Sequence, residues 1–149
     1  MRMSESITAV KKRPEFRNIH AFKDLPTYRL PAAGWVSILH RISGVIMFVL
    51  LPFIIWMFDT SISSDISFAR FKGAFNVGML GLPGFMFKLV ALALIWAFLH
   101  HFTAGVRHLW SDTHHKAVTK HSGKKSATGT LAISLFLTVV LGAKLFGLY

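Results

Sequence analysis

The sequence predicts an all-α membrane protein with three transmembrane helices, and three observations support this fold class. Hydrophobic residues make up 53% of the 149-residue chain and the mean hydropathy is +0.52, which is more apolar surface than one soluble core of this size could bury. The apolar residues gather in three blocks, 42–58, 89–99 and 131–148. Each block can be extended to the roughly 20 residues that cross a bilayer. The net charge of +11 is carried largely by the segments that flank these blocks.

The distribution of charge predicts how the helices are oriented. Residues 1–30 contain seven Lys or Arg and the 110–127 connection contains four Lys, whereas two basic residues in the 59–84 connection are offset by two acidic ones. The positive-inside rule then places the N-terminus and the 110–127 connection in the cytoplasm, and the 59–84 connection and the C-terminus outside. Because the basic residues flank apolar blocks instead of covering a soluble face, nucleic-acid binding is not expected.

Residues 1–30 are expected to form a polar cytoplasmic arm, and residues 31–149 the three-helix transmembrane domain. Pro31 can open the first helix, which is predicted over 32–58. Pro52 can kink this helix because proline removes a backbone hydrogen bond from a helix interior. The chain contains no cysteine, which excludes disulfides, thiolate-bound zinc and cysteine-bound iron–sulfur clusters on this chain.

The 59–84 connection and the two later helices complete the predicted layout. Aromatic and Met side chains recur in the connection at a spacing of three to four residues, which predicts a short helix in the outer membrane interface. An ordinary loop whose apolar residues pack on the helix ends is the alternative. The recurring aromatic and Met side chains are Phe68, Phe71, Phe75 and Met79. The second transmembrane helix is predicted over 85–110 and the third, a packing helix, over 127–148.

Ionisable residues cluster where the second predicted helix should be most apolar. They are His100, His101, Arg107 and His108. Such groups are costly inside a membrane and usually mark a functional site. His101 and His108 are seven residues apart, so they lie on one helical stripe about 10 Å apart along the axis. The predicted topology brings Ser37, His40 and Arg41 of the first helix toward the same end of the bundle.

A haem fits this arrangement. Haem iron takes axial imidazole nitrogens, and His101 lies at a depth where it could bind iron, with Gly105 one turn away leaving room for the flat ring. The anionic propionates would face the polar surface, where His40, Arg41 and His108 provide cationic or hydrogen-bonding groups. A six-coordinate haem would take its second ligand from another subunit, with His100 or a residue of a different helix as the less favoured alternative.

Simpler roles stay open for the same residues. His101 could be a hydrogen-bond partner between helices, Arg107 could anchor the end of its helix, and the Ser37 hydroxyl could bond back to a helix carbonyl. His100 faces about 100° away from His101 and is expected to be a packing or interface residue. An exchange of the ligand role between these two neighbours also stays open.

Two motifs resemble signatures of the cytochrome b subunit family of succinate dehydrogenase. The segment S-I-L-H-R-I-S-G at 37–44 resembles the family pattern S-x-x-H-R-x-S-G. The segment H-F-T-A-G-V-R-H-L-W-S-D at 101–112 resembles the pattern H-x-x-x-G-[aliphatic]-R-H-x-x-x-D. Both occur in order, on the expected helices, in a chain of the expected length.

The resemblance implies a role for each candidate residue. His101 would be an axial ligand of the iron of haem b, with the other ligand supplied by a second membrane anchor. His40, Arg41 and His108 would surround the haem propionates. Ser37 and Arg41 would line a ubiquinone site, where a hydroxyl can bond a quinone carbonyl and a cation can stabilise developing negative charge.

The resemblance also implies partners and a location. The chain would be one of two anchors that hold a flavoprotein subunit and an iron–sulfur subunit on the cytoplasmic face of a bacterial inner membrane, rather than on the mitochondrial inner membrane. Electrons from succinate would pass through these subunits to ubiquinone. The chain alone would have no catalytic residue and no dehydrogenase activity.

Three alternatives remain at this level. The first is the anchor of a fumarate reductase, because the sequence does not encode the direction of electron flow. The second is a small transporter of protons or solutes, although transporters tend to show internal repeats and midplane polar sites, and here the cluster lies toward one face. The third is a structural anchor without a cofactor.

Overall fold

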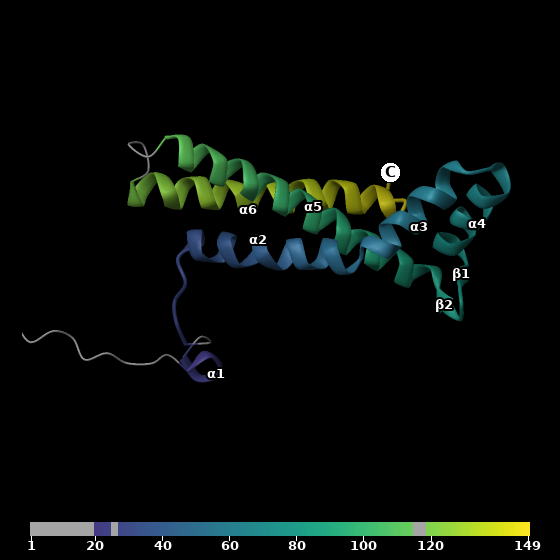
Figure 1. Ribbon diagram of the computed structural model, residues 1–149, viewed down its shortest axis with the longest axis horizontal. Coiled ribbons are helices and arrows are strands. Elements are labelled where there is room, and N and C mark those ends of the chain that lie inside the picture. Colours follow the sequence, from purple (N-terminus) through teal and green to yellow (C-terminus); the bar gives the residue numbers. More distant parts are fainter. Residues whose placement is uncertain (1–19, 25–26, 115–118) are drawn as a thin grey trace, which may run out of the picture.

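The computed structural model describes residues 20–24, 27–114 and 119–149, and Figure 1 shows their arrangement as a long bundle of helices with a smaller unit at one end. The predicted arm, residues 1–30, lies mostly outside the described residues. The elements in chain order are α1 (Ala21–Asp24), α2 (Ala32–Val49), α3 (Leu51–Ile62), α4 (Asp65–Asn76), β1 (Gly78–Met79), β2 (Leu82–Pro83), α5 (Gly84–Thr113) and α6 (Lys120–Leu145).

Three of these helices, α2, α5 and α6, are long and apolar enough to cross a membrane, which confirms the predicted three-helix membrane fold. Helix α5 packs against both α2 and α6. In Figure 1 the start of α2 lies at the same end of the bundle as the connection between α5 and α6, and α3, α4 and the C-terminus lie at the other end. Most of the basic N-terminal segment and residues 115–118 lie outside the described residues, so the pairing of the basic segments stays a prediction. The assignment of that end to the cytoplasm stays a prediction.

The first predicted helix, 32–58, is wrong as a single element. Leu50, with φ −88° and ψ 8°, separates α2 from α3, and Pro52 lies in the first turn of α3. Proline lacks the N–H that a helix interior needs, but the first turn has no use for that donor. The chain therefore breaks just before the proline, and the apolar segment continues to Ile62 in a second helix (Figure 1).

The 59–84 connection contains the predicted short helix. Helix α4 begins with a capping box in which the Ser64 hydroxyl accepts a hydrogen bond of 3.1 Å from the Ser67 backbone N–H. Such a cap satisfies backbone donors that the first turn leaves unpaired. Phe75 packs edge-on against Phe87 of α5, with ring centroids 6.2 Å apart, so the helix folds back onto the bundle. Met79, the fourth member of the predicted pattern, lies in β1 instead. A location of α4 in the membrane interface stays a prediction.

The ends of α5 and α6 differ from the predicted ends. Helix α5 extends to Thr113, and α6 begins at Lys120, earlier than the expected 127. The cause is a capping box between Thr119 and Ser122, which lets a polar segment continue the helix beyond the apolar block. The buried face of α6 consists of small side chains, which permit close helix packing. They are Ala127, Thr130, Ser134, Thr138 and Gly142.

We predict that Gly84→Ala destabilises the protein by about 1–3 kcal/mol, as overpacking of a close contact does. A Cβ atom at Gly84 would lie 2.5 Å from the Phe75 carbonyl oxygen and 2.8 Å from its carbon, and both are backbone atoms that cannot rotate away. Thermal unfolding of the purified membrane protein measures the loss. Gly73→Ala in α4 is the matched control, since a Cβ there would meet nothing within 4 Å. Equal stability of the two variants would contradict the prediction.

Candidate functional site

Three imidazoles meet between α2 and α5. The rings of His40 and His101 are stacked, with centroids 4.1 Å apart and an interplanar angle of 19°. The ring of His108 lies 5.3 Å from that of His40, tilted by 47°. Three residues that the sequence singled out on two different helices are therefore brought together, and His40 lies against His101 and His108 of α5.

The orientation of the His101 ring is held by the backbone of α2. Its Nδ1 lies 3.1 Å from the His40 carbonyl oxygen, which can only accept a hydrogen bond. The Ser43 hydroxyl donates to the same carbonyl at 2.8 Å and lies 3.3 Å from Nδ1. In the tautomer that makes the hydrogen bond to the His40 carbonyl, Nδ1 carries the proton and Nε2 keeps the lone pair that a metal would require. Metal-binding histidines characteristically donate their other ring N–H to such a carbonyl.

Two glycines lie against these rings, and the missing side chain at Gly44 lets the His101 ring approach α2 closely. A Cβ atom at Gly44 would lie 3.2 Å from Cε1 of His101, and a Cβ at Gly105 would lie 3.8 Å from Nε2 of His40. This His40 nitrogen is buried and has no hydrogen-bond partner within the described ranges. A buried polar atom without a partner is costly. The unpartnered His40 nitrogen therefore suits a ligand with an acidic group.

His100 lies on the opposite side of α5. Its side chain is fully buried, Nδ1 lies 3.2 Å from the Ser134 hydroxyl of α6, and its ring stacks on Trp96. This geometry confirms the expectation of a packing residue. An exchange of roles with His101 would require α5 to rotate by about 100°.

Ser37 and Arg41 lie one turn apart on α2 and have unused polar groups. Every other Ser and Thr of α2, α5 and α6 donates to a backbone carbonyl. The half-buried Ser37 hydroxyl makes no hydrogen bond to any described residue, so the simpler expectation of a bond back to its own helix is wrong. Arg41 is exposed and forms no ion pair or hydrogen bond with the described part of the chain. Both groups are therefore available to a ligand.

Arg107 does not join the histidine cluster by any hydrogen bond. Its Nε donates to the Ser126 hydroxyl at 3.1 Å, and Nη2 lies 3.5 Å from the Gly123 carbonyl oxygen. Both partners belong to the first turns of α6. Arg107 therefore ties the end of α5 to α6, which supports the simpler of its two predicted roles.

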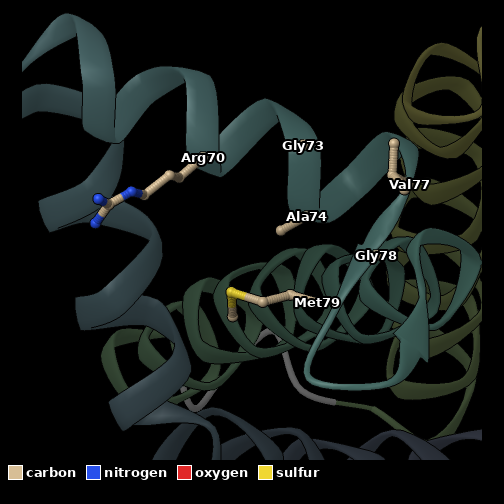
Figure 2. A pocket seen from close by; sticks show the side chains of 6 residues that line it. All are labelled: Arg70, Gly73, Ala74, Val77, Gly78 and Met79. Carbon is tan, nitrogen blue, oxygen red and sulfur yellow. The ribbon is translucent and has the colours of Figure 1, made fainter.

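A separate cavity of about 400 Å³ lies between α4 and β1. Figure 2 shows the side chains around it, with the Arg70 guanidinium at one side and the Met79 thioether at another. The remaining lining residues are Gly73, Ala74, Val77 and Gly78. The cavity lies in the unit at the far end of the bundle from the start of α2 (Figure 1), and no motif in the sequence pointed to it.

Comparisons with known proteins identify similar membrane subunits. Residues 11–141 match a family described as the succinate dehydrogenase/fumarate reductase transmembrane subunit. A succinate dehydrogenase cytochrome b556 subunit from Coxiella burnetii is 32% identical over 89 residues, which span 60% of this chain and 66% of that protein, just under two thirds. A protein of the same name from Paracoccus denitrificans is 28% identical over 116 residues, 78% of this chain and 83% of the relative.

We predict that Arg107→Leu lowers the stability of the protein by about 1 kcal/mol or less, because the lost hydrogen bonds are partly exposed. Ser126→Ala should reproduce part of this loss, and the double variant should lose less than the sum of the two. Thermal unfolding of the purified protein measures each variant. Loss of the bound ligand from an Arg107→Leu variant that is still folded would instead place Arg107 in the site.

Proposed function

Because the chain belongs to the family of succinate dehydrogenase/fumarate reductase transmembrane subunits, we propose that it is a haem b-binding membrane anchor of a succinate dehydrogenase. In this role it helps to pass electrons from an iron–sulfur subunit to ubiquinone. The observation that carries the proposal is the His101 ring, whose Nδ1 faces the His40 carbonyl at 3.1 Å and whose Nε2 is thereby left as an acceptor. Both relatives are named as cytochrome b556 subunits.

The haem would be held by residues of α2 and α5. The Nε2 atom of His101 would be one axial ligand, and Gly44 and Gly105 would leave space for the ring edge. His40, which stacks on His101, and His108, which lies tilted against His40, would bind the propionates together with the Arg41 guanidinium. When bound, the haem supplies a one-electron carrier. The second axial ligand would come from the partner anchor.

The quinone site would use Ser37 and Arg41. The Ser37 hydroxyl has no partner in the described residues and can donate to a quinone carbonyl oxygen. The Arg41 guanidinium, one turn later on the same stripe of α2, can stabilise negative charge as it develops on that oxygen. Both residues lie in the first turns of α2, near the membrane surface, where protons can arrive from water and the apolar tail can stay in lipid.

The outward faces of the helices suit a chain that is multi-pass in the membrane and bound to a second anchor. Large apolar side chains are exposed along α2, α5 and α6, among them Phe48 (78%), Phe98 (60%) and Phe136 (66%). Such surface requires lipid or another apolar partner. The proposed assembly adds a flavoprotein subunit and an iron–sulfur subunit, and the proposed location is a bacterial inner membrane with the start of α2 on the cytoplasmic side.

The anchor of a fumarate reductase is the second candidate function, because the family description names both enzymes. The two anchors would use the same haem and quinone residues. The direction of electron flow would follow from the potential of the quinone and from the soluble subunits. In either assembly the chain contributes no catalytic residue to the dicarboxylate reaction.

We predict that His101→Leu abolishes the b-type haem band in a dithionite-reduced minus oxidised spectrum of the purified complex, because the proposed iron ligand is removed. His100→Leu should keep the bound haem, since His100 faces α6. Absence of the band from the wild-type complex would refute the haem proposal. Loss of the band in the His100 variant alone would reassign the ligand.

We predict that Ser37→Ala and Arg41→Leu each lower quinone-coupled succinate oxidation about tenfold or more, the effect expected from removing one polar contact in a water-poor site. Oxidation of succinate with an artificial dye should persist, because that route does not use the anchor. Ser111→Ala is the matched control, since its hydroxyl is already bonded to the Arg107 carbonyl at 2.9 Å. Equal loss of both activities would argue against a quinone role.

A further inference from the structure

His100 is a buried polar residue that the proposed haem and quinone roles leave unused. It is among the largest fully buried side chains, and its Nδ1 lies 3.2 Å from the Ser134 hydroxyl of α6. Its ring stacks on Trp96, one turn earlier on α5, with centroids 5.6 Å apart and an interplanar angle of 16°. A buried polar pair between two membrane helices commonly specifies how they pack.

Outside this pair, apolar packing holds the middle of the α5–α6 interface, with Leu92 of α5 so close to Gly142 of α6 that a Cβ there would lie 2.8 Å from Leu92 Cδ1. The buried residues of α5 include Ala91, Ala97 and Ala104, and those of α6 are also small. The hydroxyls of Thr130 and Thr138 donate to carbonyls of α6 itself. In the middle of the bundle, away from the first turns of α6, no other side-chain hydrogen bond joins α5 to α6 among the described residues. Small residues let the two helices approach closely, but they leave the angle about the helix axis loosely specified.

We infer that His100 is a positioning residue, whose hydrogen bond to Ser134 sets the rotation of α5 so that His101 faces His40. Adjacent residues on α5 bond to opposite neighbours: His100 to α6 and His101 to the backbone of α2. A rotation by one residue, about 100°, would carry His101 out of reach of the His40 carbonyl. The inference rests on the proposed role of His101 as the haem ligand.

The test uses the complex purified with its native subunits and three variants of the hydrogen-bonded pair. His100→Phe keeps a ring of similar size against Trp96 but removes the hydrogen bond. Ser134→Ala removes the same bond from the α6 side with minimal change of volume. His100→Asn keeps an amide group near the position of Nδ1 and serves as the conservative rescue. Thr130→Val is the matched control, since this hydroxyl lies on the same face of α6 but bonds within α6.

The readouts are the haem-to-protein ratio and the low-spin electron paramagnetic resonance signal of the oxidised haem, which responds to the orientation of the axial imidazoles. His100→Phe and Ser134→Ala should each shift and broaden this signal while the haem content is retained. The double variant, which combines His100→Phe with Ser134→Ala, should show no larger shift than His100→Phe alone, because both changes remove the same hydrogen bond. His100→Asn and Thr130→Val should match the wild type.

Two results would overturn this inference and leave the proposed function intact. The first is an unchanged resonance signal in Ser134→Ala while the wild type carries haem. The second is a change of the signal in Thr130→Val as large as that in Ser134→Ala. If His100→Phe fails to assemble, Ser134→Ala decides, because that change is small. A wild-type complex without haem would refute the proposed function and the inference with it, which distinguishes the two failures.

Discussion

Polar groups inside a membrane-spanning helix must find their partners within the protein, because lipid offers none. The bundle obeys this constraint almost everywhere. Its hydroxyls bond to helix carbonyls, and its proline lies where a missing N–H costs nothing. The exceptions are therefore informative. The Ser37 hydroxyl, the Arg41 guanidinium and the Nε2 atom of His40, all on α2, lack partners in the described residues, and so does the buried Nε2 atom of His100 on α5.

Helix α5 is the element on which the site depends, because its two faces serve different purposes. One face packs on α6 through alanines and His100, and the other presents His101 and His108 to α2. Consecutive residues on a helix point about 100° apart, so two neighbouring histidines can act on opposite sides. One ring nitrogen of each histidine is hydrogen-bonded, His100 Nδ1 to Ser134 and His101 Nδ1 to the His40 carbonyl, while Nε2 of His100 stays without a partner in the described residues.

The number of membrane helices and the candidate residues could be predicted from local information. Apolar blocks of sufficient length can only be spans or buried helices, and a seven-residue spacing places His101 and His108 on one stripe whatever the neighbours do. The helix ends were predicted less well. The start of α6 follows from a capping box in a polar segment, which hydropathy does not register, and the break at Leu50 follows from a proline whose effect was expected to be only a kink.

Composition, spacing and motif thus determined the membrane class, the three spans and the set of residues worth considering, because each is a property of one helix or of one segment. The tertiary structure decided which neighbouring helix each of those residues faces and which partner it bonds. Whether His100 or His101 faces α2, whether the Ser37 hydroxyl stays unbonded and whether Arg107 belongs to the site or to α6 depend on the rotation of one helix against another. That rotation is set by contacts between residues distant in the chain, such as His101 with His40 and His100 with Ser134, and no local pattern encodes it.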